Sequence, residues 1–104
     1  EALEKAKTEN KPIFLDIYAT WCGPCKMLKK RTFSDKEVGD YYNANYVNIA
    51  VDGETKEGRE LASKFNIQGY PTLLILDKTG KQLATQVGFV EPHILVNFGK
   101  RIVP

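Results

Sequence analysis

Short apolar runs alternate with amphipathic stretches along this chain, and the two patterns predict different elements. The apolar runs are rich in β-branched and aromatic residues, have the length of buried strands, and lie at 13–19, 46–51 and 72–76. The first run is apolar except for Asp16, which suits a strand covered by helices on both faces. A turn at 77–80 leads into residues 82–87, whose alternation predicts a hairpin partner of lower burial.

Polar stretches with apolar residues at helical spacing lie between these runs. The first of them ends at the Asn10-Lys11-Pro12 breaker, and Pro92 opens the last. Ser34 and Glu37 have the spacing of a capping box, Ser34-Asp35-Lys36-Glu37, at the start of another helix. The expected helices lie at 1–10, 22–31, through Val38, Tyr41 and Tyr42, at 57–65, and through Ile94, Leu95, Phe98 and Ile102.

The order of these elements gives a strand-helix-strand half followed by a strand-strand-helix half. This order predicts an α/β fold, a central mixed β-sheet flanked by helices on both faces. The 104 residues, of which 42% are hydrophobic and 27% charged, are too few for two independent cores. We therefore expect a single domain over residues 1–104.

The charges argue against nucleic acid as the natural partner. The formal net charge of +2 comes from interspersed Lys, Arg, Asp and Glu and not from a basic block. The basic positions 26 and 29–31 are expected to form a solvated helix face. Because the chain opens on Glu1, we expect any initiator methionine, signal peptide or membrane anchor to have been removed or to lie outside it.

Both cysteines of the chain lie two residues apart in Trp21-Cys22-Gly23-Pro24-Cys25, at a strand-to-helix junction. A helix start offers unpaired N–H groups and the positive end of the macrodipole, which stabilise a thiolate, the form that attacks disulfides. We expect Cys22 to be the partly exposed attacking sulfur and Cys25 to face inward within its reach. A loop this short adds little to stability, so the pair is interpreted as a dithiol/disulfide switch.

Metal chemistry at this pair lacks the necessary ligands. No second CxxC exists and His93 is the only histidine, so a tetrahedral zinc site of Cys and His cannot be completed. Lys26 stands where covalent haem attachment needs histidine. We expect no metal and no bound cofactor.

Asp16 is the one acid in an apolar strand. Burial should raise the pKa of its carboxyl and make it a proton carrier, unless it is a hydrogen-bonded structural aspartate or lies at an edge.

Four spaced features resemble the thioredoxin family: Asp16 in the first strand, Trp21-Cys22-Gly23-Pro24-Cys25-Lys26, Tyr70-Pro71-Thr72 before the third strand, and Gly88 after the fourth. The resemblance covers essentially the whole chain and implies the thioredoxin fold. The segments 11–16 and 32–35 are similar to thioredoxin-like domains of cell-envelope reductases, such as the C-terminal domain of DsbD.

The resemblance also implies roles for single residues. In the family the first cysteine attacks, the second resolves, and Gly-Pro between them, here Gly23 and Pro24, goes with a reducing site. In the family the acid matching Asp16 lies beneath the pair and helps to deprotonate the resolving cysteine through water. The family also has a lysine near this acid, and Asn48 takes its place here.

The Tyr70-Pro71 bond is expected to be cis, as in the family, and to leave the main chain of residue 70 free to pair with an extended substrate segment. Trp21, Tyr70 and Gly88 would form an apolar contact rim, the alternative for Trp21 being simple packing.

These implications predict a thiol-disulfide oxidoreductase, mainly a protein disulfide reductase. Its expected partners are protein or peptide disulfides and a dithiol protein or reductase that returns electrons. We expect a monomer in the periplasm or at another extracytoplasmic face, with the cytoplasm as the alternative. The other functions considered are a disulfide oxidase or isomerase on the same scaffold and a redox-silent interaction module.

Overall fold

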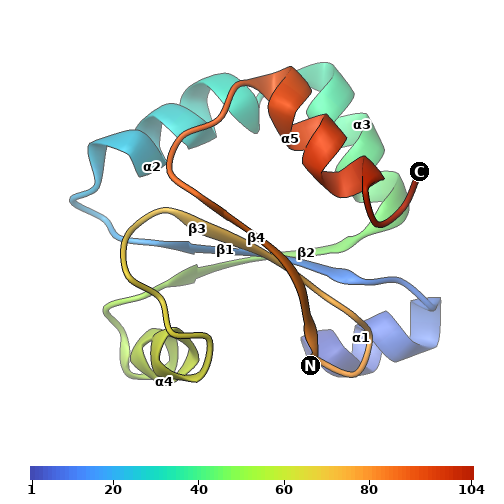
Figure 1. Cartoon of the computed structure of the whole chain (residues 1–104), viewed down its shortest axis with the longest axis horizontal. Helices are drawn as coiled ribbons and strands as arrows, with labels where there is room; N and C mark the ends of the chain where they lie inside the picture. Colours follow the sequence, from blue (N-terminus) through green and yellow to red (C-terminus); the bar gives the residue numbers. More distant parts are fainter.

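Four strands form one mixed sheet in the order β2-β1-β3-β4 (Figure 1). They are β1 (Ile13–Tyr18), β2 (Val47–Asp52), β3 (Thr72–Leu76) and β4 (Gln82–Val87). β1 is parallel to β2 and antiparallel to β3, and β3 is antiparallel to β4. This computed structural model describes all 104 residues, and its sheet confirms the mixed topology predicted from the element order.

Helices cover both faces of the sheet, as the sequence predicted (Figure 1). α2, the adjoining η1, α3 and α5 lie on one face, and α1 and α4 lie on the other. None of the helices is both long and apolar enough to cross a bilayer. Their bounds are α1 Ala2–Glu9, α2 Gly23–Met27, η1 Leu28–Thr32, α3 Lys36–Asn45, α4 Lys56–Lys64 and α5 Pro92–Lys100.

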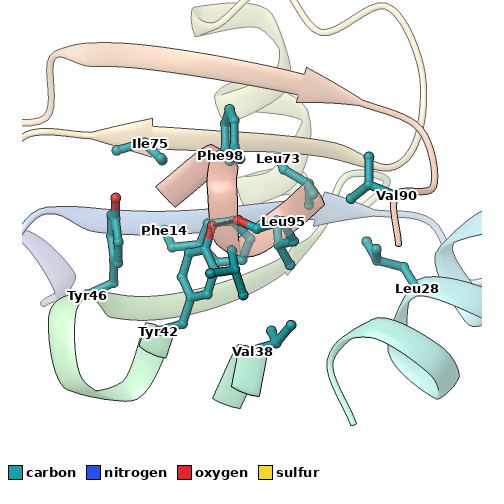
Figure 2. Packing of buried hydrophobic residues seen from close by; sticks show 11 residues of the cluster. Phe14, Leu28, Val38, Tyr42, Tyr46, Leu73, Ile75, Val90, Leu95 and Phe98 are labelled. Carbon is teal, nitrogen blue, oxygen red and sulfur yellow. Dashed lines mark hydrogen bonds between the residues drawn. The ribbon is translucent and has the colours of Figure 1, made fainter. Parts of the chain in front are cut away.

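Alternation along β1 divides the core into two clusters. Phe14 points into the larger cluster, under α3 and α5, together with Leu73, Ile75, Leu95 and other residues (Figure 2). Ile13, Leu15 and Ile17 point to the opposite face, where α1 and α4 pack. This confirms that β1 is covered on both faces, and it puts Asp16, two residues after Phe14, on the α2 and α3 face.

Three tyrosine hydroxyls join α3 and the residue before β2 to α5 and the residues that follow it. The hydroxyls of Tyr41, Tyr42 and Tyr46 donate to the main-chain carbonyls of Val103, Leu95 and Gly99, at 2.5, 2.6 and 2.8 Å. Burial raises the pKa of Tyr46, so this hydroxyl stays a neutral donor. The three tyrosines are therefore packing residues that connect these elements.

Three local predictions were wrong. β2 is an edge strand with exposed Asn48 and Ala50, because the sheet ends there and no further strand covers it. The cap of α3 is Asp35, whose carboxylate accepts the N–H groups of Glu37 and Val38, while Ser34 donates to the Lys30 carbonyl instead. The helix expected over 22–31 changes after Met27 into the π-helical turn η1.

Candidate functional site

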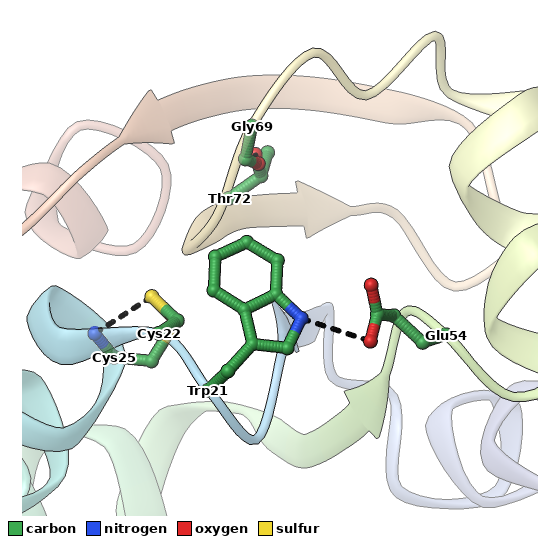
Figure 3. Close-up of a disulfide and its surroundings, with 6 residues drawn as sticks. All are labelled: Trp21, Cys22, Cys25, Glu54, Gly69 and Thr72. Carbon is green, nitrogen blue, oxygen red and sulfur yellow. Dashed lines mark hydrogen bonds between the residues drawn. A yellow bond between two sulfur atoms is a disulfide. The ribbon is translucent and has the colours of Figure 1, made fainter.

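The two cysteines are joined by a disulfide at the start of α2 (Figure 3). Cys22 is the N-cap residue with an extended backbone, and its sulfur accepts the N–H of Cys25 at 3.1 Å. Pro24 lies in the first turn, where its missing N–H leaves no intrahelical bond unmade. The Cα atoms are 5.2 Å apart, within the usual range for a disulfide, so the predicted pairing is confirmed.

The expectation that Cys22 is partly exposed was wrong for this oxidised form. Cys22 is 3% exposed and Cys25 is 9% exposed, although Gly23 and Pro24 between them face solvent. The two cysteines form a small buried cluster with Ala19, and Tyr18 and Tyr70 pack against this cluster. The disulfide therefore lies at the start of α2 with little of either cysteine exposed to solvent.

Asp16 lies on the sheet face that α2 and α3 cover, and only 8% of it is exposed. Its Oδ1 atom is buried without a hydrogen-bond partner, and burial raises the pKa of the carboxyl from 3.8 to about 6. This confirms the predicted direction of the shift and contradicts a structural aspartate held by hydrogen bonds. A proton can therefore be gained or lost here near neutral pH.

A cavity of about 280 Å³ adjoins this carboxyl, and Asn48 is one of its lining residues. The Asn48 amide donates to the Tyr42 carbonyl at 3.0 Å and makes no hydrogen bond to Asp16. Asn48 thus occupies the cavity wall without supplying the positive charge that a lysine would bring. No cation offsets the desolvation of Asp16, so the upward shift of its pKa stands uncompensated.

The Tyr70-Pro71 peptide bond is cis, as predicted. Pro71 is buried, and its carbonyl accepts the N–H of Gly88 at 2.8 Å, which brings the loops before β3 and after β4 together. Gly88 has a φ of 91°, a conformation that favours glycine. Neither the N–H nor the C=O of Tyr70 is hydrogen-bonded within the chain, so both are free to pair with an extended segment.

Trp21 lies beside the disulfide and is 64% exposed (Figure 3). Its indole N–H donates to Oε1 of Glu54 at 2.9 Å, and its ring meets the Tyr70 ring edge to face with centroids 5.9 Å apart. A methyl group on Gly53 would lie 2.5 Å from the Tyr70 ring, so a larger residue there would force the ring to move. Sequence reasoning missed Gly53 and Glu54, because nothing in the sequence joins this loop to a tryptophan 33 positions away.

The loop after β4 is attached to η1, a connection that the sequence also did not reveal. The hydroxyl of Thr32 donates to the Val90 carbonyl at 2.6 Å in the core. Arg31 pairs with Glu91 at 3.2 Å and lies over the ring of Phe89, so it is not simply a solvated charge as expected. Lys26, Lys29 and Lys30 are exposed, as predicted.

Comparison with known proteins agrees with this geometry. Residues 1–102 match the model of the thioredoxin-like domain family. The thiol:disulfide interchange protein DsbD of Actinobacillus pleuropneumoniae is 36% identical over 95 residues, a match that covers 88% of this chain and 16% of DsbD. The chain thus spans about a sixth of the length of that relative.

Two solved structures extend the comparison. A candidate disulphide-isomerase from Bacteroides thetaiotaomicron has a TM-score of 0.84 and 41% identity, covering 95% of this chain and 82% of that one. The oxidised C-terminal domain of DsbD from Neisseria meningitidis has a TM-score of 0.80 and 26% identity, covering 96% and 89%. The likeness to DsbD is therefore a likeness to its C-terminal domain.

Proposed function

We propose that this chain, a member of the thioredoxin-like family with a CxxC pair, is a thiol-disulfide oxidoreductase that works mainly as a protein disulfide reductase. The observation that carries the proposal is the Cys22–Cys25 disulfide at the start of α2, next to an unpaired Tyr70 main chain. A bond between these sulfurs is the product that a reductase leaves after one turnover.

The reaction begins with the reduced pair. The Cys22 thiolate attacks one sulfur of a substrate disulfide, which forms a mixed disulfide and releases the other substrate sulfur as a thiolate. Cys25 then loses its proton and attacks Cys22, so the second substrate sulfur leaves and the Cys22–Cys25 disulfide forms. The substrate gains two electrons and two protons, and the pair loses them.

Asp16 takes the proton from Cys25 in this proposal. A base suited to this step has a pKa near the working pH, and burial gives Asp16 a pKa of about 6. Asp16 is on the sheet face covered by α2, the helix that contains Cys25. In the proposed step the proton passes between the two residues through water. In this role Asp16 limits the second step of the reaction and leaves the first unaffected.

The substrate disulfide is held by main-chain pairing with Tyr70 and by apolar contact with Trp21 and Gly88. The free N–H and C=O of Tyr70 support a short β-pairing with an extended substrate segment. Main-chain pairing of this kind accepts many substrate sequences. The substrate class is therefore proteins or peptides with an accessible disulfide. Electrons return from a dithiol protein or reductase, at an extracytoplasmic face such as the periplasm.

Replacing the resolving sulfur tests these roles. Cys25→Ser should attack and then stall, so that reducible adducts of the protein with disulfide substrates accumulate on non-reducing gels and in intact-mass spectra. Cys22→Ser is the matched control and should form none. Adducts that accumulate on Cys22→Ser, or none on Cys25→Ser, would reverse or remove the assigned roles.

Disulfide isomerisation is the second candidate, favoured by the Bacteroides relative that carries this description. The two functions differ in the potential of the pair, because an isomerase or oxidase is reduced more readily than a reductase. Equilibrating the protein with glutathione redox buffers and counting free thiols by mass measures that potential. A value near that of protein disulfide isomerase would decide against the reductase.

A further inference from the structure

The low exposure of the two cysteines restricts the access of small thiols to this disulfide. A thiolate must approach a sulfur along the line of the S–S bond, yet Cys22 is only 3% exposed. The neighbouring Gly23 and Pro24 are exposed, so the helix tip itself is at the surface. Tyr18 and Tyr70 are the partly buried aromatic residues that pack against the cluster formed by Ala19, Cys22 and Cys25.

The two aromatic residues differ in how firmly their main chains are held. Tyr18 ends β1, is paired in register with Asp52, and its carbonyl accepts the N–H of Gly53 at 2.7 Å. Neither the main chain of Tyr70 nor its hydroxyl makes a hydrogen bond within the chain. Packing alone therefore holds the Tyr70 ring.

That packing is specific. The ring lies against Gly53, where an added methyl group would come within 2.5 Å of its Cε1 atom and 2.7 Å of its hydroxyl. On another side the ring meets Trp21 edge to face, and Glu54 fixes the indole through its N–H (Figure 3). Gly53 and Glu54, in the loop after β2, thus fix the position of the Tyr70 ring, in the loop before β3.

We propose that the Tyr70 ring, seated on Gly53 and braced by Trp21 and Glu54, shields the Cys22 sulfur and slows the attack of small thiols on the disulfide. The inference deepens the proposed function and rests on it. A protein partner that pairs with the Tyr70 main chain gains binding energy that can displace the ring as it docks. A small thiol gains none, so the shield favours protein partners over free thiols.

Dithiothreitol is a suitable probe, because each step of its reaction is defined. One of its thiolates attacks Cys22, the Cys22–Cys25 bond breaks, and Cys25 leaves as a thiolate that takes a proton from water. The second dithiothreitol sulfur then closes on the first, giving cyclic oxidised dithiothreitol and freeing Cys22. The rate is followed by acid quenching, alkylation and mass measurement.

Gly53→Ala should displace the ring, and Tyr70→Ala should remove it. We expect both variants to react with dithiothreitol threefold to tenfold faster, roughly the range in rate that one aromatic edge-to-face contact is worth. Gly69→Ala is the matched control, because an added methyl group there meets nothing within 4 Å, and its rate should equal that of the unaltered protein. Tyr70→Phe keeps the ring and should react more slowly than Tyr70→Ala.

The equilibrium with glutathione separates access from altered sulfur chemistry. A shield changes forward and reverse rates together, so the equilibrium constant should stay at the value of the unaltered protein. Rates that stay unaltered in both Gly53→Ala and Tyr70→Ala would overturn the proposal, as would a faster rate explained by an equal change in the equilibrium constant. Reduction of insulin by the unaltered protein tests the proposed function separately, since it does not depend on these variants.

Discussion

Asp16 is the residue whose burial is least compensated. One oxygen of its carboxyl has no hydrogen-bond partner. Among the residues that line the adjoining cavity, the only other titratable group is the Tyr42 phenol. Tyr42 is itself committed to the Leu95 carbonyl. The ionised carboxylate is therefore unfavourable in the folded chain. This raises the pKa of Asp16 into the range that a proton carrier needs, and it lowers the free energy of unfolding.

Asp16→Asn should stabilise the protein at neutral pH while slowing its catalysis. The native carboxyl has a pKa of about 6 against 3.8 ordinarily, so the native state binds the proton more tightly than the unfolded chain does. Stability therefore falls as the pH rises from about 4 to 6, by up to about 3 kcal/mol. The variant lacks this fall, so urea unfolding should show its advantage at pH 7.5 and little difference near pH 3.

A matched control removes one charge elsewhere. Glu60→Gln replaces an exposed acid that makes no hydrogen bond or ion pair, and its unfolding free energy should follow that of the unaltered protein at every pH. If Asp16→Asn also follows that curve, the carboxylate is not desolvated in solution and its assignment as the proton carrier loses its basis.

At the scale of single residues, the sequence predicted those whose residue type is unusual for the element in which they lie. An acid in an apolar strand, two cysteines at a helix start and a proline ahead of a strand are all visible in the sequence, and the structure confirms where they lie. Gly53, Glu54 and Thr32 were missed, because their importance comes from partners distant in sequence. The predicted exposure of Cys22 was wrong for the same reason, since Tyr70, from a distant loop, packs against the cluster that contains Cys22.

At the scale of elements, η1 connects α2 to the loop that follows Gly88. The Thr32 hydroxyl holds the Val90 carbonyl, and Arg31 reaches Glu91 and Phe89, so the end of the helix fixes the loop that follows Gly88. Thr32 is fully buried, whereas the Arg31–Glu91 pair is half exposed and screened by solvent. The buried hydrogen bond should be the stronger link.

Thr32→Val keeps the shape of the side chain and removes this link. The buried Val90 carbonyl then lacks its donor, which should lower the free energy of unfolding by about 1 to 3 kcal/mol. Urea unfolding of the oxidised protein measures the loss. Thr8→Val, an exposed position on α1 with no hydrogen bond from its side chain, is the control and should change stability little; an equal loss in both variants would contradict the link.

The positions of the strands and helices could be predicted from the sequence, but the helix cap, the π-helical turn and the exposure of β2 could not. Period and composition placed each strand and helix to within a few residues, because burial of one face dictates both patterns. The π-helical turn of η1 and the cap at Asp35 depend on how the chain leaves one helix and enters the next, where Ser34, Asp35 and Glu37 offer competing hydrogen bonds. The exposure of β2 depends on the strand count of the sheet, which no single segment encodes.

For the whole molecule, redox state and stability are coupled. If the folded chain favours the disulfide more than the unfolded chain does, the oxidised protein is the more stable form and the pair is reducing. Two features of the structure act in opposite directions. Burial of Cys22 penalises its thiolate and favours the disulfide, while the Cys25 N–H at 3.1 Å from the Cys22 sulfur favours the thiolate.

Burial should prevail, because a single N–H group cannot replace the hydration that a thiolate loses at 3% exposure. We therefore expect the oxidised protein to unfold at a higher urea concentration than the reduced protein, as a reductase requires. Each 1.4 kcal/mol of difference corresponds to a potential about 30 mV below that of the same two cysteines in the unfolded chain. The Cys22→Ser, Cys25→Ser double variant has neither the bond nor the thiolate, so it should unfold at a urea concentration between those of the oxidised and the reduced protein. A reduced form that unfolds at the higher urea concentration would instead mark an oxidase, since stabilising the dithiol is what makes a pair oxidising.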